Sequence, residues 1–401
     1  MKGSFEYLEK RVIRRGLCTA CGTCAGVCPA LAIGWTYVDD EPLPELTGEC
    51  TGCGVCTAVC PGEEVNIPAL EHFVFGRARD ERVPDLGLYR DARAAWAVDR
   101  GIRAKGAGGG LVTALLIYAL EKGIIDCALV AGFQHNQPWR TEPRLAASKD
   151  ELTAAAQSKY ACVPVNTLLT RAYEQGYRRM AVVGLPCHIH GLRKMQYSGQ
   201  PGSLVQSLVF MVGLFCASQF YFEGTRHLLV ERLGIELDEI AGLSYRGGQW
   251  PGHLVVELQD GRRLTLDRHQ YMYHHLMPVF KRDRCEMCVD WSAELADLSV
   301  GDYWDPRAGA KETRGTSSCL VRTPVGEAIM AGAAKDGYVQ TISLEASRLA
   351  AGVGYELKKH GAAFRLKQRR RFGWPVPEYH RETDYTPFAR ELHLAPESKN
   401  S

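Results

Sequence analysis

Two cysteine-rich segments with the same spacing lie near the start of the chain. Residues 18–29 read CTACGTCAGVCP and residues 50–61 read CTGCGVCTAVCP, so both follow C-x2-C-x2-C-x3-C-P, with corresponding cysteines 32 residues apart. In such paired motifs, three cysteines of one segment and the fourth of the other converge on one [4Fe-4S] cluster. The spacing therefore predicts two clusters, one bound by Cys18, Cys21, Cys24 and Cys60 and the other by Cys50, Cys53, Cys56 and Cys28.

Zinc and disulfide bonds are the alternatives for these cysteines. A tetrahedral zinc site is satisfied by pairs of ligands, so the third closely spaced cysteine and the Cys-Pro of both segments are surplus to it. Disulfides belong to exported chains, whereas residues 1–16 are charged throughout and lack the apolar core of a signal peptide. Gly22, Gly52 and Gly54 let the backbone turn tightly around an inorganic core. We therefore expect a small electron-conducting unit here.

Length and charge limit what the rest of the chain does. Its 401 residues suggest two or three units, and 46% hydrophobic residues are enough for a sizeable core. With 48 basic and 46 acidic residues the net charge is +2, which argues against a nucleic-acid or membrane-surface protein. No apolar run reaches the 18 residues of a membrane span. We expect a cytoplasmic protein whose fifteen cysteines serve mainly in metal binding.

Beyond a linker over residues 62–90, strands and helices alternate. Residues 94–99 and 124–133 have the pattern of strands, and between them a helix runs from Leu111 to a stop at Gly123. Helices over 149–156 and 167–176 and a strand from Met180 follow. Helices between buried strands predict an α/β domain with a mostly parallel sheet, preceded by the small α+β ferredoxin-like domain with two [4Fe-4S] clusters.

A glycine-rich turn, Lys105 to Gly110, opens the first of these helices. Glycines allow a phosphate to approach closely, and the free N–H groups of a helix start favour an anion such as a flavin diphosphate. The turn does not have the spacing GxGxxG, so a flexible connection explains it equally well.

Four later cysteines form a second group. Cys187 and Cys216 each follow an apolar strand that passes through a glycine, at points where we expect helices to begin, and Cys285 and Cys288 form a C-x2-C pair. Parallel strands bring their carboxyl ends to one edge of a sheet. Four thiols are the number that a third [4Fe-4S] cluster requires, although a zinc site or buried free thiols fit the same spacing. Cys127, Cys162 and Cys319 are expected to pack as small hydrophobic residues.

Several motifs in order carry a family resemblance. They are GGGLVTALLIYALEKGIID from Gly108, SKY at Ser158–Tyr160, VVGLPC, VGLFC, and C-x2-C-x-D followed by ELADLSVGD from Glu294 to Asp302. Over about residues 95–345 the chain resembles the beta subunit of coenzyme F420 hydrogenases and dehydrogenases. That family also looks related to hydroxymethyl-chlorophyll and divinyl-chlorophyllide reductases, so the fold does not name the substrate.

The resemblance implies a [4Fe-4S] cluster next to a noncovalent FAD. It assigns Cys187, Cys216, Cys285 and Cys288 as cluster ligands, and Gly108, Gly109, Gly110, Thr113, Ser158, Lys159 and Tyr160 as flavin contacts. It further implies a ferredoxin-like domain with its linker over 1–84, a flavin and iron–sulfur domain in two parts over 85–185 and 186–350, and a basic C-terminal extension over 351–401. No catalytic acid, base or nucleophile is assigned.

The function that this resemblance implies is electron transfer between clusters and a hydride-exchanging substrate, most simply coenzyme F420. A flavin accepts a hydride while a cluster carries single electrons, so the pair converts one into the other. Ferredoxin or a partner redox subunit would supply or take the single electrons. The alternatives are a ferredoxin-dependent reductase of a tetrapyrrole or other unsaturated substrate, the electron-input subunit of a larger dehydrogenase complex, and a noncatalytic metal-stabilised module.

Two local features stay open between a functional and a structural role. The family commonly has glutamine after the cysteine of GxPC, whereas this chain has His188 and then His190. A histidine there could tune a cluster or pass a proton, but more often it caps or solvates a helix. The basic run from Arg365 to Phe372 could dock an acidic partner or a polyanionic coenzyme tail, but a solvated helix face is favoured.

Overall fold

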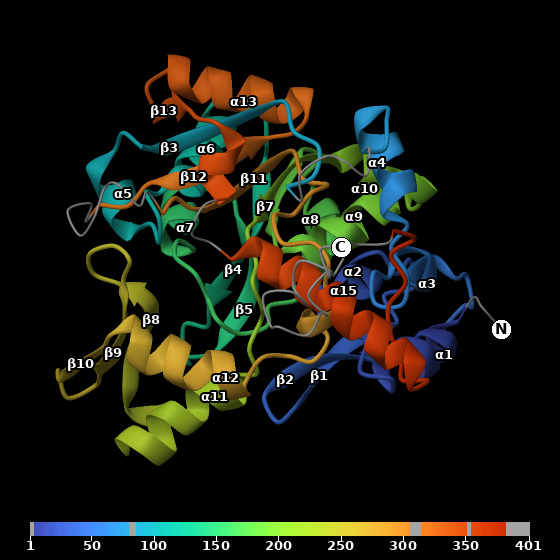
Figure 1. Ribbon diagram of the computed structural model, residues 1–401, viewed down its shortest axis with the longest axis horizontal. Helices are drawn as coiled ribbons and strands as arrows, with labels where there is room; N and C mark the ends of the chain where they lie inside the picture. Colours follow the sequence, from blue (N-terminus) through green and yellow to red (C-terminus); the bar gives the residue numbers. More distant parts are fainter. Residues whose placement is uncertain (1–3, 80–85, 305–313, 351–353, 382–401) are drawn as a thin grey trace, which may run out of the picture.

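A computed structural model describes residues 4–79, 86–304, 314–350 and 354–381. The linker residues 80–85, and residues 351–353 and 382–401 of the expected C-terminal extension, lie outside the described residues. A small N-terminal domain packs against one face of a large sheet, and the long helix α15 (Tyr355–Arg371) crosses the region between them (Figure 1). Within the described residues, no helix combines the length and apolar character that crossing a bilayer requires.

The N-terminal domain repeats one local design around its two cysteine segments. Gly22 and Gly54, which occupy equivalent positions, have φ of 87° and 79°, a conformation that disfavours other residues, and each caps a short helix carrying a cysteine. The elements are α1 (Phe5–Leu8), η1 (Glu9–Ile13), α2 (Thr23–Gly26), β1 (Ile33–Val38), β2 (Glu41–Leu46) and α3 (Val55–Val59). β1 and β2 form an antiparallel hairpin.

The expected linker contains a helix, α4 (Ile67–Phe75), which the sequence analysis missed. The side chain of Asn66 caps it by accepting a hydrogen bond from the Ala69 N–H at 3.1 Å. Leu70 is buried, and Phe73 meets Tyr197 edge-on with ring centroids 5.6 Å apart. The neighbouring residues are rich in glycine, proline and charge, which is typical of a linker. The apolar face with which this helix packs onto the larger domain was therefore not recognised from the sequence.

The large sheet confirms the α/β class and has eight strands in the order β13-β3-β12-β11-β7-β6-β4-β5. Parallel pairing is confined to the four adjacent strands β11, β7, β6 and β4, and the flanking strands pair antiparallel, so the sheet is mixed where a mostly parallel one was expected. The strands are β3 (Asp91–Ala97), β4 (Cys127–Phe133), β5 (Thr141–Ala146), β6 (Met180–Gly184), β7 (Leu208–Leu214), β11 (Leu298–Asp302), β12 (Ser317–Val321) and β13 (Val339–Ser343).

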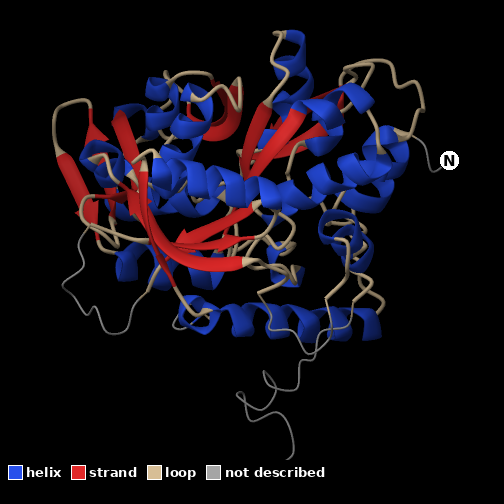
Figure 2. Cartoon of the chain, turned by 90° about the horizontal axis from the view of Figure 1, so that it is seen from above, coloured by secondary structure: helices blue, strands red, loops and turns tan. Residues whose placement is uncertain are grey.

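Helices cover both faces of this sheet (Figure 2). Side chains alternate along β4: Ala128 and Val130 belong to the core formed with α6 and α13, while Cys127 and Leu129 belong to the core formed with α8, α9 and the N-terminal domain. The helices are α5 (Arg100–Lys105), α6 (Leu111–Glu121), α7 (Lys149–Ala154), η2 (Val165–Leu168), α8 (Leu169–Glu174), α9 (Pro186–Ser198), α10 (Gly202–Ser207), α13 (Pro324–Lys335) and α14 (Ala346–Ala350).

A second, three-stranded antiparallel sheet is inserted between β7 and β11. Its strands are β8 (Ile240–Gly247), β9 (His253–Leu258) and β10 (Arg263–Leu266), accompanied by α11 (Phe222–Arg226), η3 (His227–Arg232), η4 (Leu237–Glu239), η5 (His269–Leu276), α12 (Met277–Val279) and η6 (Cys285–Met287). This insertion was not predicted from the sequence. It has its own core around Tyr245, Leu254 and Tyr271, and it ends at the C-x2-C pair.

Candidate functional site

One predicted set of front cysteines surrounds a single cavity. Cys28, Cys50, Cys53 and Cys56 all line it, and they are the four residues that the motif spacing assigns to one cluster. Cys50 and Cys53 are exposed at the surface, whereas Cys28 and Cys56 are buried. A cluster bound here would lie at the surface of the protein.

The other predicted set of front cysteines, Cys18, Cys21, Cys24 and Cys60, lies deeper in the protein. Burial and the fields of Cys60, Cys21 and Cys18 raise the pKa of the Cys24 thiol well above its ordinary value. Burial, with Cys21 next, raises the pKa of Cys60 to about 12. Backbone N–H groups of Ala20 and Gly62 donate to the sulfurs of Cys18 and Cys60, each at 3.4 Å. Raised pKa values favour the protonated thiols, and binding to iron would convert them to thiolates.

The four later cysteines meet at one place. Cys187, Cys216, Cys285 and Cys288 line the same cavity although they come from three separate segments. A single zinc ion would need sulfurs about 3.8 Å apart, from a Zn–S bond of about 2.3 Å. No group of three His, Cys, Asp or Glu side chains in the described ranges gathers closely enough to hold one ion. The four thiols surround a cavity, which suits an inorganic core of several atoms.

The central strands and one bridge bring these segments together. Cys187 lies in the first turn of α9, directly after β6, and Cys216 follows β7, which is the parallel neighbour of β6. No helix begins at Cys216, contrary to the expectation; instead its N–H donates to the Trp291 carbonyl at 2.8 Å, outside any regular helix. A bridge between Phe220 and Lys281 then carries the C-x2-C pair to the same edge.

Positive side chains line this cavity with the thiols. Burial raises the pKa of Cys216 to about 12, and it also raises the pKa values of Cys187 and Cys288. Arg282, Arg284 and Lys358 lie in the same wall. Burial lowers the pKa of Lys358, but the fields of Cys288, Cys216 and Cys285 outweigh burial and the net shift is upward. The wall thus suits an anionic group ligated by sulfur.

The deeper front set and the third cavity are adjacent. Thr19, between Cys18 and Cys21, and Pro61, next to Cys60, both line the third cavity. After burial, the field of Cys21 contributes most to the raised pKa of Cys187. The three sites are therefore arranged in order from the surface to the interior: the solvent-exposed front set, then the deep front set, then the cavity of the four later cysteines.

Helix α9 holds the N-terminal domain against this site. A Cβ at Gly191 would lie 2.2 Å from the Thr23 hydroxyl oxygen, so only glycine allows this approach. Asn166 donates to that same hydroxyl at 2.8 Å and to the His188 carbonyl at 3.0 Å. Lys194 donates to the carbonyls of Cys60 and Glu64, both at 2.6 Å. These contacts fix the position of the front cysteines relative to the cavity.

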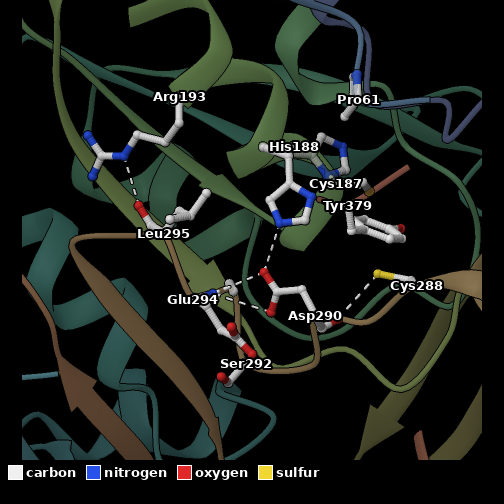
Figure 3. A network of polar contacts seen from close by, with 12 residues as sticks. Pro61, Cys187, His188, Arg193, Cys288, Asp290, Ser292, Glu294, Leu295 and Tyr379 are labelled. Atoms are coloured by element: carbon white, nitrogen blue, oxygen red, sulfur yellow. Dashed lines mark hydrogen bonds and ion pairs between the residues drawn. The ribbon is translucent and has the colours of Figure 1, made fainter. Parts of the chain in front are cut away.

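The two histidines differ in role. His188 is buried outside the cavity, where its Nδ1 accepts from the Leu185 N–H at 3.2 Å and its Nε2 lies 2.9 Å from the Val163 carbonyl oxygen. Burial lowers its pKa to about 4, which favours the neutral ring, and the two backbone contacts favour a structural role in capping α9. His190 lines the cavity, and its Nε2 lies 2.9 Å from Asp290 Oδ2. Figure 3 shows Asp290 beside Cys288, with Cys187 and Tyr379 close by.

Several cavity residues were missed from the sequence. Arg282 and Arg284 both lie just before Cys285, in the sequence R-D-R-C. These two basic residues next to the C-x2-C pair are the one signal that could have identified them. Arg282 donates to the Cys162 sulfur at 3.0 Å, and Cys162 donates to Gln219 at 3.1 Å. Cys162 thus has polar partners, unlike Cys127 and Cys319, which are buried in strands of the apolar core. Lys358 and Tyr379 carry no local signal at all.

A second cavity of about 830 Å³ lies beside the glycine-rich turn. Its wall has four arginines and two tryptophans together with Gly106 and Ala107 of the turn; these side chains are Arg100, Arg103, Arg246, Arg314, Trp96 and Trp250. Guanidinium groups suit phosphates and indole rings suit planar heterocycles. The volume is within the range of cofactor pockets, so these residues fit the diphosphate and a ring of FAD.

None of the predicted flavin residues is in the wall of this cavity. Gly108, Gly109 and Gly110 end the glycine-rich turn and Thr113 lies in the first turn of α6; a Cβ on Gly108 would meet Asp302 at 2.3 Å. Lys159 donates to the carbonyls of Ala155, Ala156 and Gln157 at 2.5 to 3.1 Å, and Tyr160 meets Tyr245 with ring centroids 5.4 Å apart. Ser158 is partly buried in the same loop. Their role as flavin contacts stays a prediction.

Arg246 and the end of β11 connect the two cavities. Arg246 donates to the Ala107 carbonyl at 2.9 Å and pairs with Asp302, which contacts the glycine turn. The preceding residue, Gly301, packs directly on Phe215, next to Cys216. The Asp302 of the sequence motif thus positions Arg246, a residue that the sequence analysis did not single out.

The basic run on α15 makes surface contacts. Arg365 pairs with Glu286 at 2.7 Å and Arg370 pairs with Glu378 at 2.9 Å, with all four side chains partly or largely exposed. Arg369 lies over the Trp374 ring at 5.4 Å. A solvated helix face accounts for this run.

Comparisons with known families agree with this architecture. Residues 92–170 and 177–347 match the N-terminal and C-terminal parts of the family described as coenzyme F420 hydrogenase/dehydrogenase, beta subunit, and residues 10–67 match a 4Fe-4S dicluster domain. The two beta-subunit matches adjoin one another and cover the large sheet and its insertion.

Individual proteins show the same similarity. The chain is 31% identical over 298 residues to the coenzyme F420 hydrogenase subunit beta of Methanothermobacter thermautotrophicus, covering 73% of this chain and 99% of that one. It is 30% identical to the coenzyme F420-dependent sulfite reductase of Methanocaldococcus jannaschii, covering 81% of this chain and 47% of the relative. A solved F420-reducing [NiFe] hydrogenase complex from Methanosarcina barkeri contains a chain of the same fold, with TM-score 0.58, 24% identity and coverage of 74% and 98%.

Proposed function

Because the chain belongs to the coenzyme F420 hydrogenase/dehydrogenase beta-subunit family and carries a 4Fe-4S dicluster domain, we propose that it exchanges electrons between three [4Fe-4S] clusters and a hydride-exchanging substrate with the help of FAD. Its relatives are named as a coenzyme F420 hydrogenase subunit and a coenzyme F420-dependent sulfite reductase, which supports electron transfer as the activity of this chain. Coenzyme F420, named in those relatives, is the substrate that we propose first.

One observation carries this proposal. Cys187, Cys216, Cys285 and Cys288 line a single cavity whose wall also contains Thr19 and Pro61 of the front cysteine segments. A third cluster bound there would be the neighbour of the cluster held by Cys18, Cys21, Cys24 and Cys60. Cysteines of the front sets and the third cavity would hold three carriers in a row, which would supply a path for single electrons with one end at the exposed Cys50 and Cys53.

FAD is proposed for the cavity beside the glycine-rich turn. When bound, it would take up or release a hydride and exchange the two electrons singly with a cluster. Arg246, fixed by Asp302, and Arg103, which donates to the Gly315 carbonyl at 2.8 Å, present guanidinium groups to the cavity wall. Trp250, whose ring centroid lies 4.5 Å from that of Trp304 with the two planes tilted by 46°, supplies a flat apolar surface. These side chains would bind the phosphates and exclude water from one ring.

The test is anaerobic purification of the full chain with iron, sulfide and flavin measured, followed by rapid mixing with reduced F420. We expect about twelve iron atoms and one flavin per chain, and fast bleaching of the flavin absorbance. A full set of cofactors without bleaching would contradict F420 as the substrate. About eight iron atoms would contradict the third cluster.

Two other functions remain as alternatives within the same chemistry. The chain spans 99% of a relative that is named as a subunit of a hydrogenase, which favours an electron-transfer subunit of a larger complex. Copurification with a partner in fixed ratio would support that role. Turnover of an unsaturated substrate by the isolated chain with reduced ferredoxin alone would support a self-contained reductase.

A further inference from the structure

The C-terminal segment over residues 354–381 lies beyond the part of the chain that matches the beta-subunit family, which ends at residue 347. It nevertheless contributes Lys358 and Tyr379 to the wall of the cavity lined by the four later cysteines. A segment outside the family match therefore takes part in lining the site of the proposed third cluster.

The ammonium group of Lys358 is held at the cavity by the loops that carry the cysteines. It donates to the carbonyl of Ala217, next to Cys216, and to the carbonyl of Cys285 at 3.3 Å. Glu286, the carboxylate in its field, already pairs with Lys281 at 3.2 Å and Arg365 at 2.7 Å. The charge of Lys358 is thus directed at the cysteine cavity.

Contacts on both sides prevent this lysine from moving away. The next residue, Lys359, forms a buried ion pair with Glu294, which also pairs with Arg79. At the other end of the segment, Tyr379 accepts a hydrogen bond from Arg284 at 3.0 Å. The Glu378 carbonyl accepts from Val65 N–H at 2.8 Å, which ties the segment to the N-terminal domain.

A [4Fe-4S] cluster with four thiolates is anionic, and its reduction adds one more negative charge. A cation fixed beside it therefore stabilises the reduced form more than the oxidised form. We propose that Lys358, positioned by α15, raises the reduction potential of the third cluster, so that the C-terminal segment controls electron exchange between that cluster and the front pair. This inference rests on the proposed third cluster.

The experiment is an EPR-monitored redox titration of the full-length K358M variant, purified anaerobically, with iron counted in the same sample. At a fixed solution potential we expect the ratio of reduced to oxidised third cluster to fall at least ten-fold. This corresponds to a decrease of 59 mV in the reduction potential of a one-electron couple. The front clusters should keep their potentials. The control is R371Q, which removes an exposed charge from the same helix and should leave the ratio unchanged.

The outcomes separate the two proposals. About eight iron atoms in the unaltered protein would overturn the third cluster and this inference with it. About twelve iron atoms in K358M with an unchanged potential would overturn the inference alone. If K358M loses the third cluster, the charge-conserving variant K358R is measured. Recovery of both the iron content and the reduction potential would support the role of the positive charge. Continued loss of the cluster would show that the lysine acts through its packing and would overturn the inference.

Discussion

Arg246 donates two hydrogen bonds to the carboxylate of Asp302, at 2.7 Å to Oδ2 and 3.2 Å to Oδ1. This pair joins the inserted three-stranded sheet to the end of β11, and the exposed fractions of the two side chains are only 4% and 16%. The orientation of Arg246 toward the glycine turn therefore depends on Asp302.

We expect D302N to destabilise the protein by about 3 kcal/mol, because it leaves a buried guanidinium without its counter-charge. The same change should lower the flavin content. Anaerobic urea unfolding and the flavin per chain measure both effects. The control is D260N, since Asp260 pairs with Arg262 at the surface, and we expect it to cost less than about 1 kcal/mol. Full flavin content in D302N would contradict the assignment of this cavity.

The buried network of Arg79, Glu71, Glu294 and Lys359 should contribute strongly to stability. Burial raises the pKa of Glu294, but Arg79 and Lys359 outweigh burial and hold that pKa well below its usual range. Replacing Arg79 with methionine leaves two buried carboxylates with reduced compensation, and we expect a loss of about 3–5 kcal/mol. R90M, which breaks the exposed pair with Glu327, is the control. Equal effects of the two changes on the unfolding midpoint would refute this.

Cys285 should be a ligand of the third cluster and Cys319 should not be. We expect C285S to lower the iron content by about four atoms per chain while the EPR signals of the front clusters persist. C319A, at a buried position of β12, should keep all the iron. Unchanged iron in C285S would remove the third cluster from the proposal.

Exposure should make the surface cluster the first to be lost. Cys50 and Cys53 are exposed, whereas the cysteines of the deep front set and the third cavity are buried or only partly exposed, and reactivity with oxidants follows access. The EPR signal of the surface cluster is identified as the one that C53S lacks. When the unaltered protein is briefly exposed to oxygen, we expect this signal to disappear first. Earlier loss of the signal that is absent in C285S would contradict the inward order of the sites.

Lys159 should make stability depend on pH. Burial, with the field of Arg144 next, lowers its pKa from 10.5 to about 7. Between these values the unfolded chain holds a proton that the folded chain lacks, so this residue makes the free energy of unfolding rise with pH from about 7 to 10.5. We expect K159M to flatten the rise in anaerobic urea unfolding, and K149M, at an exposed position, to retain it. An unchanged slope in K159M would refute this.

Local spacing alone determined the front half of the site. Cysteines separated by only two or three other residues, with glycines at Gly22 and Gly54, constrain the backbone within a few bonds. The set around the cavity at Cys28, Cys50, Cys53 and Cys56 could therefore be assigned from the motif. The alternation of strands and helices likewise predicted the central parallel strands, because buried strands and amphipathic helices have distinct periods.

The sequence by itself determined which residues have the chemistry to bind clusters, and only the tertiary structure decided which of them meet. Cys187, Cys216 and Cys285 lie far apart in the chain, and they come together through the pairing of β6 with β7 and the bridge between Phe220 and Lys281. Lys358 and Tyr379 reach the same cavity only because α15 docks across the two domains. The physical reason is that short spacings are set by covalent geometry, whereas contacts between distant residues depend on how strands pair and which faces are buried.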